Sequence, residues 1–173
     1  MMDYSRFVAE MSAIETNGLP LQWIKFVDSK NLKNVVDAAK SYFCYCQICG
    51  MVRPKMLVPI PLNEFGVTRT AHIYLDNFPA EIPLVTTDAI LRDYWGRKMD
   101  EPSHEHHVHG SLFGRTRICF CSSEDWSERF SLFKLIVNVS LWHRLYYKHL
   151  QTGISIRDLE QMLHLGSPML ATH

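Results

Sequence analysis

The sequence predicts an α+β domain with an N-terminal helix, an antiparallel four-strand meander, an irregular active-site loop and C-terminal helices. Strand-like segments follow one another in the first half of the chain, and the clearest helical pattern comes only after them. A parallel sheet would need strands that alternate with helices, so this order favours an antiparallel sheet. No internal repeat or linker-like stretch divides the chain. Residues 1–173 are therefore expected to form a single domain.

The first half of the chain supplies the first helix and the strands. An apolar stripe from Phe7 to Ile14 predicts a helix over residues 3–16, which Asn17-Gly18 would end. Strands are expected where β-branched and aromatic residues fill short segments. These segments are residues 21–28, 42–49, 55–62, 69–75 and 84–87. Residues 29–40 fit either a short helix or a loop.

Prolines restrict two stretches of this predicted sheet. Pro59 and Pro61 lack the amide hydrogen that a central strand needs, so residues 55–62 are expected at an edge or in an extended run. Pro79 and Pro83 predict an extended, turn-bearing link after residue 75. Beyond the last strand, residues 87–100 have helical spacing and are expected to form an excursion on the surface.

The strongest helical pattern follows Trp126. Apolar residues recur three and four positions apart as far as Leu150, and Gly153 is a stop signal. Ser127 or Ser131 is expected to cap the start of this helix. Residues 155–165 predict a short final helix.

Composition narrows the classes of function. The chain has 18 basic and 18 acidic residues, and a protein that binds nucleic acid usually has a basic excess. No stretch reaches the roughly 18–20 apolar residues that cross a bilayer, so no membrane association is expected. The five cysteines are an odd number, and the N-terminal residues are too polar for a secretory leader. We expect a cytoplasmic protein with reduced thiols.

Reactive residues concentrate between residues 104 and 126, which contain four histidines, a Cys-x-Cys and an acidic pair. Cys119 fits three roles: a nucleophile, a metal ligand or a buried core thiol. Beside Arg115 and Arg117 its pKa is expected to fall, which would favour a reactive thiolate. In an extended segment Cys121 would lie on the same face as Cys119.

The same residues also allow a zinc site. His107 and His109 would share a face of an extended chain, and Cys119 or Cys121 would complete a set of ligands. Cys46-x-x-Cys49 is the other half that such a site needs, although the combined spacing is not a standard framework. The alternative is that the histidines line a turn and donate hydrogen bonds near Cys119. If the histidines line a turn in this way, we expect neither a metal ion nor another cofactor.

In their order, these pieces resemble the ubiquitin-conjugating (UBC-fold) enzymes, in particular stand-alone bacterial members. Residues 72–85 look like the end of the family's meander and its proline-rich link. The segment His107-Val108-His109 is similar to the HPN turn, and Arg117-Ile118-Cys119-Phe120 is similar to the segment with the catalytic cysteine. Trp126 takes the place of the family tryptophan, and residues 141–153 resemble the ending of bacterial members.

The chain departs from the family pattern in the HPN-like turn, in the spacing between that turn and Cys119, and in having a second cysteine nearby. Val108 and His109 replace the proline and the asparagine, and the gap to Cys119 is longer than usual. Cys121 offers a second nucleophile. Cys119 is preferred because an isoleucine precedes it and an aromatic residue follows it.

The resemblance implies a transferase that carries an acyl group as a thioester on Cys119. An E1-type activating enzyme would supply a ubiquitin-like protein or another protein's C-terminus, and a lysine would receive it. Similar bacterial proteins belong to anti-phage operons such as CBASS, where the modified protein is the CD-NTase-type nucleotidyltransferase. His109 would stabilise the oxyanion or orient the loop, with His107 as an auxiliary residue. Glu124 and Asp125 would orient or deprotonate the lysine, unless they are only solvated carboxylates of the loop.

Two further interpretations stay open. An inactive UBC-like or RWD-type binding module is one, although such domains lack a cysteine at the position of Cys119. The zinc-binding protein described above is the other. A redox switch between Cys119 and Cys121 is a smaller alternative, because disulfides in Cys-x-Cys are strained.

Overall fold

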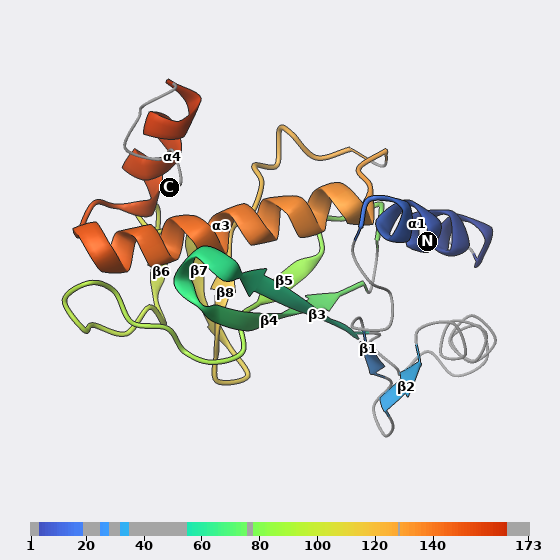
Figure 1. The fold of residues 1–173 in the computed structure, drawn as a ribbon, viewed down its shortest axis with the longest axis horizontal. Helices are drawn as coiled ribbons and strands as arrows, with labels where there is room; N and C mark the ends of the chain where they lie inside the picture. Colours follow the sequence, from blue (N-terminus) through green and yellow to red (C-terminus); the bar gives the residue numbers. More distant parts are fainter. Residues whose placement is uncertain are drawn as a thin grey trace.

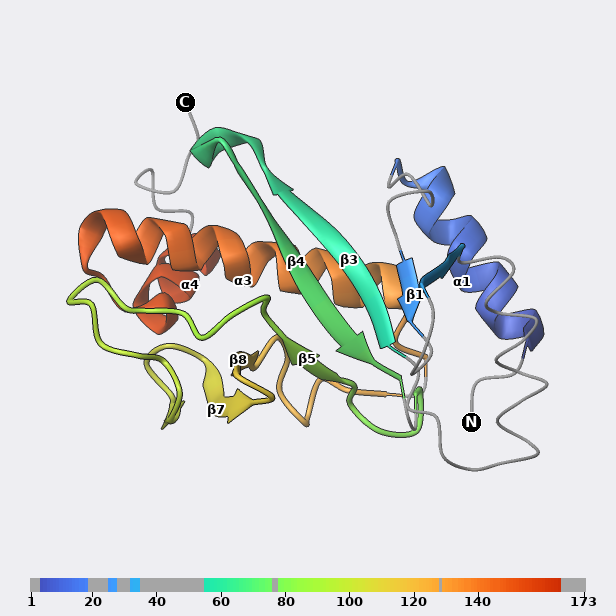
Figure 2. The ribbon, with the colours of Figure 1, turned by 90° about the horizontal axis from the view of Figure 1, so that it is seen from below.

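The computed structural model describes residues 4–18, 25–27, 32–34, 55–75, 78–127 and 129–165. In this part of the chain an antiparallel sheet is crossed on one face by the long helix α3 (Leu132–Thr152). Helix α1 (Tyr4–Thr16) lies near the start of α3, and α4 (Ile156–His164) packs beside its end (Figures 1 and 2). The predicted α+β class is thus confirmed.

The described strands form one sheet of eight in the order β2-β1-β3-β4-β5-β8-β7-β6, in which all neighbours are antiparallel. Their bounds are β1 Lys25–Val27, β2 Leu32–Asn34, β3 Lys55–Leu62, β4 Val67–Tyr74, β5 Leu84–Thr86, β6 Pro102–Ser103, β7 Val108–Leu112 and β8 Arg115–Ile118. Strands β3, β4 and β5 are consecutive and adjacent, which gives a meander, and β1 pairs with the other side of β3. The prediction of four strands was wrong, because β2 extends the sheet at one side and β8, β7 and β6 extend it at the other.

The β3–β4 hairpin is the longest pairing in the sheet, from Lys55 opposite Tyr74 to Leu62 opposite Val67. The 3₁₀ helix η2 (Asn63–Phe65) connects the strands at the predicted turn. Strand β1 pairs only with residues 55–57 of β3. In the described part of the chain, both prolines of β3 therefore lie where β3 has a partner on one side only, as an edge position requires.

Two segments show how the loops outside the main hairpin are arranged. Residues 32–34 pair with β1 as strand β2, so the expected helix or loop is wrong at these positions. Residues 87–100 form no helix. They form an irregular excursion, as expected, although Leu91 and Met99 at its ends are buried and an isolated bridge joins Arg92 to Lys98. The predicted strand at residues 42–49 lies outside the described residues.

The helices begin and end where capping chemistry predicts. Lys134 N donates to the hydroxyl of Ser131 at 3.1 Å, so Ser131 is the cap of α3. At the other end Gly153 has a φ of 73°, and its N–H donates to His149 O at 2.8 Å. Ser155 caps α4 in the same way as Ser131 caps α3.

The core lies between α3 and the sheet. Leu132, Leu135 and Ile136 on α3 and Ile60 and Ile73 on β3 and β4 are almost fully buried. Each such side chain stabilises the fold by about 1.5–3 kcal/mol relative to full exposure, so this interface fixes the position of α3. In the described part of the chain, no helix is both long enough and apolar enough to cross a membrane.

Helix α1 is joined to α3 by a buried carboxylate. Glu10 is 8% exposed, and its Oε2 accepts a hydrogen bond from Leu132 N at 2.8 Å. A carboxylate at a helix N-terminus also interacts favourably with the helix dipole. Glu10 thereby connects the first helix to the beginning of the helix that supports the site.

Candidate functional site

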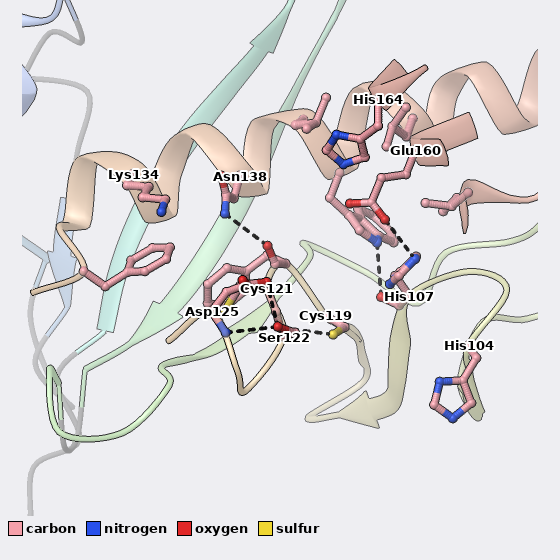
Figure 3. A pocket seen from close by; sticks show the side chains of 16 residues that line it. His104, His107, Cys119, Cys121, Ser122, Asp125, Lys134, Asn138, Glu160 and His164 are labelled. Carbon is pink, nitrogen blue, oxygen red and sulfur yellow. Dashed lines mark hydrogen bonds and ion pairs between the residues drawn. The ribbon is translucent and has the colours of Figure 1, made fainter. Parts of the chain in front are cut away.

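A pocket of about 640 Å³ lies between the region around the β7–β8 hairpin, helix α3 and helix α4 (Figure 3). Polar and reactive side chains from all three regions line it. They are His104, His107, Cys119, Cys121, Ser122, Asp125, Lys134, Asn138, Glu160 and His164. Both cysteines of the Cys-x-Cys, one of the acidic pair and two of the clustered histidines are thus brought to one place.

The hairpin itself was not expected. Residues 108–118 form β7 and β8, where the sequence suggested an irregular segment. Phe113 and Gly114 form the tight turn, both with positive φ. The buried hydroxyl of Thr116 on β8 accepts from Leu91 N at 2.9 Å and donates to Met99 O at 3.0 Å. The hairpin is therefore joined to both ends of the preceding loop.

Cys119 follows directly after β8, and the hairpin positions it. Its N–H donates to His107 O at 2.8 Å, while the side chain of Ile118 is buried in the core. The thiol donates to Cys121 O at 3.5 Å and is half-buried. The sulfur is therefore held at the pocket wall but remains accessible.

The segment after Cys119 is fixed at three points. Asn138 on α3 donates from Nδ2 to Phe120 O at 3.3 Å. The Ser122 hydroxyl donates to Asp125 Oδ2 at 2.7 Å and accepts from Asp125 N at 3.1 Å. Trp126 donates from Nε1 to Pro79 O at 3.0 Å, which joins the segment to the proline link. Asp125 consequently faces the pocket with a defined orientation.

The histidines have different surroundings. His107 has a φ of 49°, and its Nε2 lies 3.2 Å from Glu160 Oε2 on α4. Its carbonyl accepts from Trp142 Nε1 at 3.1 Å. His106 is buried, with its ring centre 4.8 Å from that of His149. This places His107 in a turn at the pocket wall, as the sequence suggested.

His109 does not line the pocket. It lies on β7 opposite Pro102, and its side chain is exposed. Partial desolvation of the imidazole by neighbouring atoms and the nearby charge of Arg117 lower the pKa of His109. Its role as oxyanion donor stays a prediction. Unlike His109, the side chains of His107 and Asn138 line the pocket and carry N–H groups that can donate hydrogen bonds there.

Neither thiol is activated in this state of the protein. Burial raises the pKa of Cys119, and the carboxylate of Glu160 adds to the effect. Burial also raises the pKa of Cys121, to about 11, with smaller contributions from Cys119 and Asp125. The expected net fall in the pKa of Cys119 was wrong, because the charge of Arg117 lowers this pKa but only partly offsets the cost of burying a thiolate.

The described residues offer no ready metal site. No group of three or more His, Cys, Asp or Glu side chains in this part of the chain could hold a metal ion. His107, His109, Cys119 and Cys121 therefore do not form a ligand set among themselves. Cys46 and Cys49 lie outside the described residues, so a zinc site that includes them stays a hypothesis.

Sequence reasoning missed the residues that the helices contribute. Lys134, Asn138 and Leu141 lie on one face of α3, and Glu160 comes from α4. The signal was present, since positions 134, 138, 141 and 145 follow helical spacing. Among these four positions only Leu141 and Leu145 are apolar, so the hydrophobic pattern of the sequence did not identify Lys134 and Asn138 as part of the same face.

The pocket combines the groups that acyl transfer between a thiol and an amine needs. Chemically, a thiol such as that of Cys119 can act as a nucleophile, a carboxylate such as that of Asp125 can accept a proton, and an amide such as that of Asn138 can donate to an oxyanion. Comparisons with models of protein families, with curated proteins and with solved structures find no match to this chain.

Proposed function

We propose that the chain is a ubiquitin-conjugating-like acyl carrier that uses the thiol of Cys119. The thiol would accept the C-terminal acyl group of a ubiquitin-like or other target protein from an E1-type activating enzyme. It would then pass that group to a lysine. The observation that carries this proposal is a half-buried thiol in a pocket that also presents Asp125 and Asn138. The motif order in the sequence supports the same chemistry.

The raised pKa of Cys119 suits a carrier. At neutral pH the free thiol is protonated, which protects it from oxidation. Exchange between two thioesters is nearly balanced in energy, so it requires only transient ionisation of the attacking thiol. A thiol of high pKa is also a poor leaving group. The thioester would therefore persist until a strong nucleophile such as an amine arrives.

Release to a lysine requires stabilisation of the tetrahedral intermediate. Asn138 donates one amide hydrogen to Phe120 O and has a second that can reach into the pocket. One such donor is typically worth about 3 kcal/mol to an acyl-transfer transition state. Asn138 would fill the role that the resemblance assigned to His109.

The incoming lysine must lose a proton before it attacks. The carboxylate of Asp125 is exposed at the pocket, and Ser122 holds it by a hydrogen bond of 2.7 Å. A carboxylate there attracts the ammonium and accepts its proton, directly or through water. The prediction that Asp125 serves the acceptor lysine is part of this proposal.

The biological setting rests on the sequence resemblance alone. It suggests a cytoplasmic bacterial protein in a CBASS-type anti-phage operon, with a CD-NTase-type protein as the carried or modified partner. Neither nucleic acid nor a membrane is part of the proposed reaction.

The test is a charging assay with the E1-type enzyme and candidate modifier encoded beside this chain. The wild type should form an adduct that a thiol reductant removes. Cys119→Ala should form none, Cys119→Ser should form an oxygen ester that resists the reductant, and Cys121→Ala should behave as wild type. An adduct lost only in Cys121→Ala would move the nucleophile by two residues. Absence of an adduct in every protein, or stoichiometric zinc in the purified chain, would contradict the proposal.

A further inference from the structure

Lys134 has a position that the proposed reaction does not use. Of the lysines in the described part of the chain, it is the one that lines the pocket with Cys119 and Cys121. Figure 3 shows Lys134 and Asn138 on the side of α3 that faces the segment with Cys121 and Asp125. A potential acceptor amine therefore shares one pocket with the proposed carrier thiol.

The amine of Lys134 is held near the pocket by a weak contact. Its Nζ lies 4.7 Å from the ring centre of Phe130, which also lines the pocket. The positive charge of Lys134 opposes the rise in the pKa of Cys121, as expected for an ammonium group near the thiols. The amine is thus directed along the pocket wall.

The side chain of Lys134 is free to change conformation. It is exposed, and none of the ion pairs in the described residues includes it. The cap of α3 uses its backbone N–H, not its amine. A contact between an exposed ammonium and an aromatic ring is weak, so the flexible stem can move the amine away from Phe130.

We propose that Lys134 is a self-modification site, where the acyl group carried on Cys119 is transferred within the molecule to form an isopeptide bond. The inference rests on the proposed function. The ammonium loses a proton to Asp125 or to water, and the neutral Nζ attacks the thioester carbonyl. The C–S bond then breaks, the Cys119 thiolate takes up a proton, and a C–N bond joins the carried protein to Lys134. No oxidant or further reactant is needed.

The modification would limit the carrier's own activity. It converts a cation at the pocket wall into a neutral amide and leaves a whole protein attached beside Cys119. That protein would obstruct the next activating enzyme. A charged carrier without an acceptor would therefore convert itself slowly into an inactive form.

The test follows a charged protein after the activating enzyme is stopped, with no acceptor added. In the wild type, the reducible adduct on Cys119 should decline while a reductant-resistant adduct appears, and peptide mass spectrometry should locate it at Lys134. Lys134→Arg keeps the charge and the ring contact but cannot accept an acyl group. It should retain the thioester longer and lose the resistant adduct. Lys148→Arg, on the same helix but outside the pocket lining, is the matched control and should behave as wild type.

Each other outcome overturns the inference in a recognisable way. A stable thioester with no resistant adduct, or a resistant adduct that persists in Lys134→Arg, rejects Lys134 as acceptor but leaves the proposed function intact. Transfer from charged Lys134→Arg to Cys119→Ala would show exchange between molecules, against a reaction within one. If no thioester forms at all, the proposed function fails first and the inference falls with it.

Discussion

His143 should make the protein sensitive to mild acid. The side chain lies on α3 with no exposed surface, and its Nδ1 is 2.8 Å from Val139 O. Its Nε2 has no hydrogen-bond partner among the described residues. Arg69 and Asp88 also face it, but they form an ion pair of 3.2 Å and largely offset each other. Protonation would therefore bury a positive charge and leave the Nε2–H without an acceptor among the described residues.

The magnitude follows from the shift in pKa. Burial lowers the pKa of His143 from 6.5 to about 4. Between these values the unfolded chain binds a proton that the folded chain does not, so stability falls as the pH falls. Each pH unit in that window costs about 1.4 kcal/mol, so the full effect is about 3 kcal/mol. Above pH 6.5 the group contributes no pH dependence.

The assay is denaturant unfolding of the wild type and of His143→Leu between pH 7.5 and pH 4. Leucine has a similar volume and retains the backbone hydrogen bond of the helix, but it does not titrate. The free energy of unfolding of the wild type should fall by about 3 kcal/mol more than that of His143→Leu over this range. Parallel curves for the two proteins would refute the reasoning and show that the buried ring finds a partner when protonated.

Three further results are expected. Iodoacetamide should label Cys119 slowly at pH 7 and faster above pH 9, with Cys121 slower still, because burial raises both pKa values; rapid labelling of both thiols at pH 7, measured by peptide mass spectrometry, would contradict the described burial. Asn138→Ala should slow discharge to lysine by roughly a hundredfold but leave charging nearly unchanged; equal effects in single-turnover assays would argue against an oxyanion role. Gly153→Ala should cost about 1–2 kcal/mol in denaturant unfolding, because φ is 73° and the new Cβ would lie 3.2 Å from the ring of Tyr94; an unchanged midpoint would mean that the helix end adjusts freely.

Local signals explain which parts of the fold could be predicted. Ser131 and Gly153 could be identified as the caps of α3 because helix capping depends only on the residues next to the helix end. The alternation of Ala71, Ile73 and Leu75 likewise identified the buried face of the β4 region. Each of these signals is complete within a few residues of sequence.

Other features depend on contacts between distant segments. The β7–β8 hairpin contains two glycines and two arginines, which interrupt the strand-like pattern, and its pairing is stabilised by the neighbouring β5 and the loop before it. The raised pKa of Cys119 follows from its burial and from the charge of Glu160 on α4, whereas the sequence shows only the nearby arginines. Lys134 and Asn138 needed the helix to be placed over the thiols before they could be recognised.

The double hydrogen bond of Thr116 has a consequence for the evolution and engineering of this region. One hydroxyl fixes both ends of the loop between Leu91 and Met99, whereas the exposed tip at Trp95 and Gly96 takes no part in that anchor. Next to that tip, Tyr94 N donates to His149 Nε2 at 3.0 Å and the Tyr146 hydroxyl donates to Arg92 O at 2.9 Å. The loop therefore ties β8 to the end of α3, and a change of its length would disturb the helix end as well as the strand that precedes the thiol.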